Sequence, residues 1–156
     1  MKFPEELTII VQDQETGRPV DKVAVRLAIV ATRKSNYSVG PLITDEKGEV
    51  VFTRAHCEFA IRTARDMFLM DYQDNLEECR PFVEIELHRA DRVTGMIRQY
   101  RAAPEFWGLA FRDPEVLVKA LEGVRNAEYQ PASITVTEEE FSTVPRIVLP
   151  VSRSKR

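Results

Sequence analysis

The sequence contains little of what several common classes of protein require. Its 156 residues include only two cysteines, two histidines and six glycines. Two cysteines are too few for a disulfide framework, so Cys57 and Cys79 are predicted to be reduced, small apolar side chains. Six glycines leave little room for a phosphate-wrapping loop, and the Gly-x-Ser-x-Gly motif of a nucleophilic serine is absent from the sequence.

Long apolar runs and an excess of basic charge are also missing. The apolar run at residues 7–11 is too short for a signal peptide, and no run approaches the roughly 20 residues of a transmembrane helix. We therefore expect a cytoplasmic protein without a membrane partner. The formal net charge of −3 is unlike the strongly basic charge of a dedicated nucleic-acid-binding domain.

What remains is the composition of one ordinary globular domain, with 44% hydrophobic and 30% charged residues. A domain of about 150 residues buries roughly 68–70% of its unfolded surface, so a core alone can stabilise it. We expect residues 1–151 to form a single domain. The basic residues 152–156 are expected to form a flexible tail.

Alternating apolar and β-branched residues predict strands along most of the chain. The predicted strands lie at residues 7–12, 23–30, 42–44, 49–53, 82–88, 133–136 and 146–151. Between them, the sequence Asp45-Glu46-Lys47-Gly48 predicts a tight turn that closes residues 42–53 into a bulged hairpin. Residues 32–38 are predicted to be a polar loop. A weaker pattern at residues 93–97 favours a further strand.

A change of period from two to about 3.6 after Thr53 predicts an amphipathic helix at about residues 54–73. Thr53 can cap this helix with its hydroxyl group. A second helix is predicted at about residues 113–126, with Asp113 as its N-cap and Pro114 at its first position.

Two segments resemble a group of small β-sandwich domains. They are Asp13-x-x-Thr16-Gly17-x-Pro19-Val20-x-x-Val23-x-Val25-x-Leu27 and Thr44-Asp45-x-x-Gly48-x-Val50-x-Phe52. They are similar to segments of transthyretin-like, carboxypeptidase-regulatory-like and bacterial immunoglobulin-like domains. The resemblance covers residues 1–53. It implies an immunoglobulin-like or transthyretin-like β-sandwich. The helix predicted after Thr53 departs from the usual pattern of that group, so we expect an α+β fold that is mainly β, with this helix inserted into the sandwich.

One enzyme of that group, hydroxyisourate hydrolase, has two functional features that this chain lacks. That family has a catalytic histidine in its opening strand, whereas residues 7–12 contain none. It also ends in Tyr-Arg-Gly-Ser, whereas this sequence ends Arg153-Ser154-Lys155-Arg156. The resemblance therefore implies a scaffold and no catalytic residue.

The soft metal ligands of the sequence do not have the spacing of a zinc motif. His56 and Cys57 are adjacent, so on a helix their side chains point in different directions, and Cys79 and His88 belong to separate predicted elements. Neither histidine stands in a recognisable catalytic motif. We predict no metal, no cofactor and no catalytic residue.

The segment 98–112 mixes cations with aromatic residues and is the candidate interaction surface. Its members are Arg98, Tyr100, Arg101, Phe106, Trp107, Phe111 and Arg112. Three interpretations remain open: a satellite core under the second helix, a protein-binding surface rich in the residues typical of hot spots, or a surface that stacks bases.

These observations favour a non-enzymatic protein-interaction or assembly module whose partner is another protein chain or a second copy of itself. The alternative is a small-molecule hydrolase with a cleft between the inserted helix and the sheet. A weaker alternative is nucleic-acid binding through residues 98–112.

Overall fold

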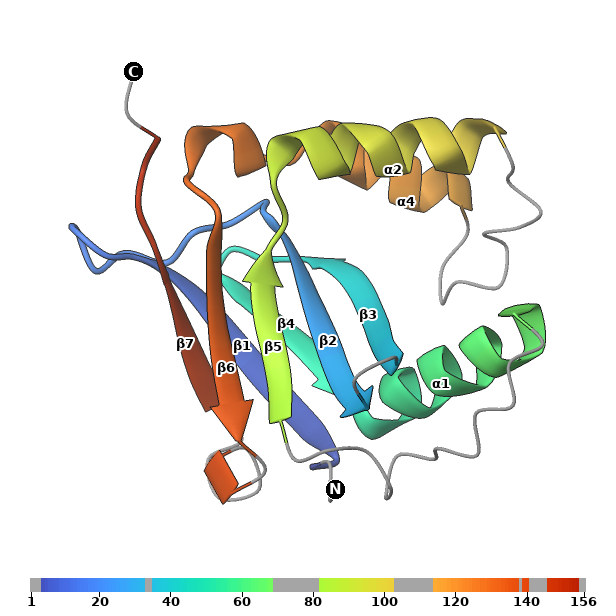
Figure 1. Ribbon diagram of the computed structural model, residues 1–156. Coiled ribbons are helices and arrows are strands. Elements are labelled where there is room, and N and C mark those ends of the chain that lie inside the picture. The colour runs from blue at the N-terminus through green and yellow to red at the C-terminus, as the bar shows by residue number, and fades with distance from the viewer. Residues whose placement is uncertain are drawn as a thin grey trace.

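The protein is a mixed α+β, sandwich-like structure in which two sheets pack face to face and helices lie at their ends and edges (Figure 1). The computed structural model describes residues 4–32, 35–68, 82–102, 114–137, 139–140 and 146–154. Among these residues, no helix has both the length and the apolar character needed to cross a membrane.

The first sheet has three strands in the order β4-β1-β7. These strands are β1 (Glu6–Asp13), β4 (Glu49–Thr53) and β7 (Arg146–Val151). β1 is the central strand, and it pairs antiparallel with β4 and parallel with β7. The three predicted strands in these segments are confirmed.

The second sheet has four strands in the order β3-β2-β5-β6. These strands are β2 (Ala24–Thr32), β3 (Ser35–Ile43), β5 (Phe82–Leu87) and β6 (Ala132–Thr137). All neighbouring pairs are antiparallel. The predicted strands at 23–30, 82–88 and 133–136 are confirmed with small shifts at their ends.

The prediction of a polar loop at residues 32–38 is wrong. From Ser35 onward these residues belong to β3, and Ser38 pairs with Ala28 of β2. β3 lies at the edge of its sheet, where one side of the strand is free for polar groups. Backbone pairing with β2 therefore extends a strand that local apolar content does not indicate.

The facing surfaces of the two sheets enclose the larger of two apolar clusters, the main core. Leu7, Ile9 and Val11 of β1 are completely buried there, while Thr8 and Ile10 between them are partly exposed. Burying one such apolar side chain contributes about 1.5–3 kcal/mol. Other buried members include Leu27, Ile29, Phe52, Cys57, Ile85 and Leu149.

The turn at Asp45–Gly48 is confirmed, but the predicted hairpin around it is wrong. The Gly48 N–H donates to the Asp45 carbonyl at 2.9 Å, and Gly48 has a φ of +71°. A Cβ at Gly48 would meet the Val11 carbonyl oxygen at 2.8 Å, so glycine is required. However, β3 pairs with β2 and β4 pairs with β1. The turn therefore carries the chain from one sheet to the other.

Helix α1 (Arg54–Phe68) begins where β4 ends, and its predicted cap is confirmed. The Thr53 hydroxyl oxygen accepts from the His56 N–H at 3.1 Å, while the His56 Nδ1 accepts from the Thr53 N–H at 3.3 Å. This reciprocal pair is a capping box in which histidine takes the place of the usual glutamate. The predicted residues 69–73 of this helix lie outside the described part of the chain.

Helices α2 (Ala90–Ala102) and α4 (Pro114–Glu122), followed by the short η2 (Asn126–Glu128), lie across one end of the four-stranded sheet (Figure 1). The second predicted helix is thus confirmed from Pro114, but it ends at Glu122 and not near residue 126, and Asp113 lies outside the described residues. The predicted strand at 93–97 is wrong, because these residues lie within α2. Five residues form a separate, smaller cluster here, called the second core: Ala24, Val93, Tyr100, Leu117 and Leu121.

The predicted tail is paired with the rest of the molecule as far as the structure describes it. Gln130 N–H donates to the Ser152 carbonyl at 2.8 Å, and Ser154 N–H donates to the Glu128 carbonyl at 2.9 Å. Arg153 also forms a bridge with Tyr129. The chain segment after β7 is therefore held against the end of η2 up to Ser154.

Candidate functional site

The predicted interaction residues divide into three groups. Arg98 and Arg101 are exposed on α2. Tyr100 is 5% exposed and packs in the second core, where burial raises its pKa. The remaining candidates lie outside the described residues; they are Phe106, Trp107, Phe111 and Arg112. The structure therefore places two cations of the predicted set on a common helix and turns its tyrosine inward.

A groove of about 330 Å³ runs between α2 and the segment formed by α4 and η2. Its apolar lining comes mainly from Ala90, Val93, Ile97, Leu121, Val124 and Ala127. Thr94 lines it from α2, and its exposed hydroxyl donates to the Ala90 carbonyl at 3.1 Å. Sequence reasoning missed this groove, because it depends on how two helices that are separate in the chain pack against each other.

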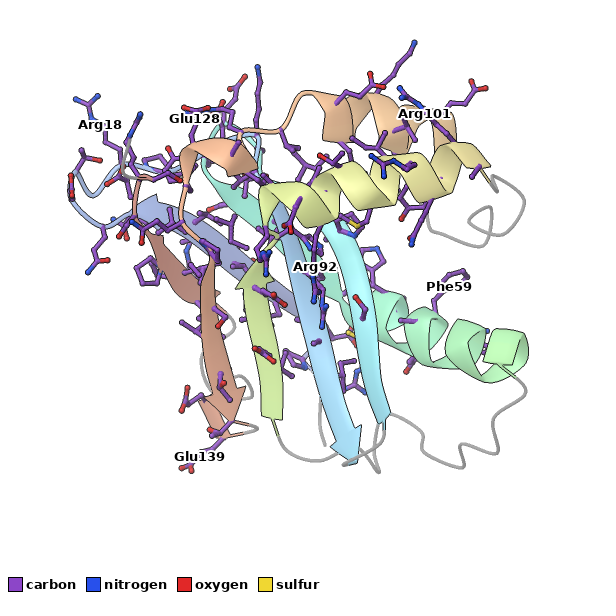
Figure 2. The ribbon with its side chains drawn as sticks, turned by 45° about the horizontal axis from the view of Figure 1, so that its top comes forward. Arg18, Phe59, Arg92, Arg101, Glu128 and Glu139 are labelled. Atoms are coloured by element: carbon purple, nitrogen blue, oxygen red, sulfur yellow. The ribbon has the colours of Figure 1, made fainter. Side chains whose placement is uncertain are left out.

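An ion pair between Arg101 and Glu122 links the two helices beside the groove. Figure 2 shows Arg101 between α2 and α4. Arg98 is exposed, and none of the described residues forms an ion pair with it. Val116 of α4 is 58% exposed and contributes an apolar side chain to the same helical layer.

Asn126 joins this helical layer to the sheet and is 2% exposed. Its Oδ1 accepts from the Ala24 N–H at 2.8 Å, and its Nδ2 donates to the carbonyls of Ala24 at 3.1 Å and His88 at 2.7 Å. The side chain therefore pairs with the ends of β2 and β5 much as a further backbone strand would. It satisfies polar groups that would otherwise be buried without partners.

Arg125 reinforces the same junction from the surface. Its guanidinium donates to Asp21 at 2.7 Å and to Glu128 at 2.9 Å, and its backbone N–H donates to the Lys22 carbonyl at 2.7 Å. The hydrogen bond with Glu128 is the main reason why its pKa is raised further. The Arg125 and Arg153 guanidinium carbons lie 5.9 and 5.8 Å from the centroid of the Tyr129 ring.

The two histidines differ sharply in their surroundings. His56 is partly exposed and takes part in the α1 cap described above. His88 is 5% exposed at the end of β5, and neither of its ring nitrogens has a hydrogen-bond partner among the described residues. Burial lowers the pKa of His88 to about 4, with further contributions from the charges of Arg26 and Arg92. His88 is therefore neutral at pH 7.

His88 lies on the outer face of the four-stranded sheet, in a group of charged and polar side chains that we call the polar cluster. Its other members are Arg26, Glu86 and Arg92. Arg26 pairs with Glu86 across β2 and β5, and their closest charged atoms are 3.8 Å apart. The Nε of Arg26 is also buried without a partner among the described residues. Arg92, which is labelled in Figure 2, comes from the first turn of α2.

The side chains that commonly bind metal ions are scattered through the described part of the protein. No group of three or more histidine, cysteine, aspartate or glutamate residues there could hold a metal ion. Cys57 is buried in the main core, and Cys79 lies outside the described residues.

No known protein-family model matches this chain, and a search of curated proteins finds no significant match. The geometry of the molecule itself must therefore carry any functional argument.

A signal for the polar cluster is present in the sequence. In β2 and β5, Arg26, Glu86 and His88 interrupt alternating apolar residues, so they share the face opposite the main core. Their register across the two strands cannot be obtained from the sequence, since β2 and β5 are far apart in the chain. Arg92 carries no such signal, because it directly precedes residues 93–97, whose pattern favours a strand and not the helix α2.

Proposed function

We propose that the protein is a non-enzymatic interaction or assembly module that binds another protein chain through the α2–α4 layer. The main support is the groove of about 330 Å³ between α2 and the α4–η2 segment. It is lined by apolar side chains and bordered by charged ones, which is the usual anatomy of a protein-binding surface. The sandwich beneath it offers a rigid support.

The surroundings of the groove favour a partner of particular chemistry. Ile97, Leu121 and Val124 offer an apolar surface that a leucine, isoleucine or phenylalanine of the partner can fill. Arg98 is exposed beside it and has no ion pair within the described residues, so it can receive a carboxylate of the partner. We therefore propose a partner segment with an apolar anchor flanked by an acidic residue.

The immunoglobulin-like or transthyretin-like type of the sandwich, and the cytoplasmic location, stay predictions from the sequence. Both agree with the proposed role, because such sandwiches commonly serve as scaffolds for binding surfaces. The nucleic-acid alternative rests on the same exposed Arg98, while Arg101 is already paired with Glu122. The hydrolase alternative would depend on His56, whose Nδ1 accepts from the Thr53 backbone.

A substitution that blocks the groove tests the proposal. Thr94→Arg places a long side chain at the lining of the groove, on an exposed helical position where arginine is well tolerated. Gln99→Arg makes the same change of charge at another exposed position of α2 outside the groove. We expect proteins captured from the source cells by the wild-type chain to be lost with Thr94→Arg and retained with Gln99→Arg.

Capture should be followed by binding measurements with the purified partner, and by sedimentation to detect self-association. Equal binding by both variants would contradict the proposal. Binding of a single-stranded oligonucleotide that weakens on Arg98→Ala and with rising salt would instead favour the nucleic-acid alternative. Turnover in a hydrolase substrate panel that is lost on His56→Ala would favour an enzyme.

A further inference from the structure

The side chain of His88 has two buried polar atoms, and no described residue forms a hydrogen bond with either of them. Its side chain is neutral, so it carries one N–H donor and one nitrogen acceptor. Both ring nitrogens are buried and lack hydrogen-bond partners among the described residues. Burial of unpaired polar groups is unfavourable and is therefore rare in folded proteins. His88 can therefore gain hydrogen bonds from a polar ligand.

Arg26 also has a buried polar atom without a partner in the described part of the chain, and it lies on the same face of the sheet as His88, in the adjacent residue pair on that face. Register pairs Arg26 with Glu86 and puts Ala24 next to His88, so the arginine and the histidine are diagonal neighbours. The Arg26 Nε is buried and unpartnered among the described residues. Even in the ion pair of Arg26 with Glu86, the Nη1 and the Glu86 Oε2 are 3.8 Å apart, which is too long for a hydrogen bond.

The charge of the polar cluster is positive. Arg26 and Arg92 both lie close enough to His88 to disfavour its protonation, and Glu86 supplies one negative charge opposite them. Glu84 is on the same face, but one row further from His88, opposite Ala28. No ion pair of Arg92 is found within the described residues, and its side chain is exposed. An exposed arginine changes rotamer within nanoseconds, so Arg92 can admit a ligand and then close over it.

We propose that His88, Arg26 and Arg92 form a binding site for a small oxyanion, a phosphate or carboxylate group, on the outer face of the sheet beneath α2. The two guanidinium groups and the imidazole N–H donate to its oxygens. The two ring nitrogens point in divergent directions, so the oxyanion pairs with one of them and a water molecule can pair with the other. The site is separate from the α2–α4 groove, whose lining contains none of these three residues.

Titration of the full chain with inorganic phosphate, followed by NMR of the side-chain nitrogens, tests this site. We expect saturable shifts of the His88 ring nitrogens and of the Arg26 Nε–H. Acetate is the carboxylate probe, and sodium chloride at equal ionic strength is the control for screening. Saturation with phosphate alone assigns the site to phosphate groups, whereas saturation with acetate as well extends it to carboxylates. Both results support the proposal.

Two arginine substitutions at exposed helical positions distinguish a specific site from general electrostatic attraction. Removing one charge-assisted contact with Arg92→Gln should weaken phosphate binding roughly tenfold. Arg62→Gln removes an equal charge from an exposed position of α1 and should leave binding unchanged. Because Arg92 is exposed, its substitution leaves the fold intact, which thermal unfolding can verify. The proposal is overturned if neither probe saturates, if sodium chloride reproduces the shifts, or if the two variants lose binding equally.

Discussion

The main core and the second core are built in different ways. Side chains from both sheets enclose the main core, and many of them are completely buried. The second core contains Ala24 of β2 and four buried side chains from α2 and α4. Around the second core, polar contacts connect the helices to the sheet and to each other. The Asn126 side chain bonds to the ends of β2 and β5, and Arg101 of α2 pairs with Glu122 of α4. Both candidate sites lie at the second core or beside it.

This difference implies that stability is unevenly distributed. Regions with fewer buried apolar contacts open locally at a lower free energy than the central strands do, and binding surfaces commonly occur in such regions. We therefore expect α2 and α4 to exchange their amide hydrogens before β1, β2 and β5 do. The following predictions test that contrast, from the largest expected effect to the smallest.

Removal of a large side chain from the main core should have the largest effect. Phe52 is completely buried, whereas Val51, its neighbour in β4, is 37% exposed on the opposite face of the sheet. Phe52→Ala should lower the free energy of unfolding by about 3–5 kcal/mol, because it leaves a cavity between the sheets. Denaturant-induced unfolding measures this loss. Val51→Ala is the control, and a similar loss in both variants would contradict the assignment of the two faces.

Lowering the pH should destabilise the folded state through His88, which lies at the border of the second core. The unfolded side chain has a pKa of 6.5 and the folded one a pKa of about 4, so only the unfolded state takes up a proton between these pH values. Stability is therefore retained above pH 6.5 and is lost as the pH falls toward 4. The gap between the two pKa values corresponds to roughly 3 kcal/mol.

Unfolding at a series of pH values measures this dependence. In His88→Gln the contribution of this residue should vanish, whereas His56→Gln should retain it. If wild type and His88→Gln lose stability in parallel, the buried, neutral state of His88 is not its cause.

The junction between the two cores should depend on Asn126. Asn126→Ala leaves the Ala24 N–H and the carbonyls of Ala24 and His88 without this partner, and we expect a loss of about 2 kcal/mol. Hydrogen exchange should rise first in α2 and α4. Gln130→Ala, an exposed amide a few residues along, is the control. Equal acceleration in β1 would show that the second core does not open separately.

The same contrast explains how much of the fold the sequence predicts. Strands of the main core bury every second residue, as β1 does with Leu7, Ile9 and Val11, and these positions are apolar, so the pattern is visible locally. The partners of these strands are not visible. The turn at Asp45–Gly48 was expected to join paired strands, yet the two strands belong to different sheets, because turn chemistry fixes a local bend and says nothing of distant pairing.

The helical layer was harder to predict, since its residues favour one structure and adopt another. Val93, Thr94 and Ile97 have β-branched side chains, which favour strands. In the protein, Val93 and Tyr100 are buried on one side of a helix, at a spacing that suits packing against α4 and Ala24. This packing outweighs local propensity. Of the predicted interaction residues, Arg98 and Arg101 are exposed, but the sequence missed both the groove and the inward position of Tyr100.

The smallest predicted effect concerns α1, which packs on the main core through Cys57 and Ala60, while none of its described side chains belongs to the second core. Thr53→Ala removes the hydroxyl that accepts from the His56 N–H and should cost about 1 kcal/mol. Thr53→Ser keeps a hydroxyl and should be close to neutral. Because α1 belongs to the main core, hydrogen exchange should rise at the start of α1 and stay unchanged in α2 and α4. A rise in α2 equal to that in α1 would mean that the two cores open together, and the division between them would then not describe how the molecule unfolds.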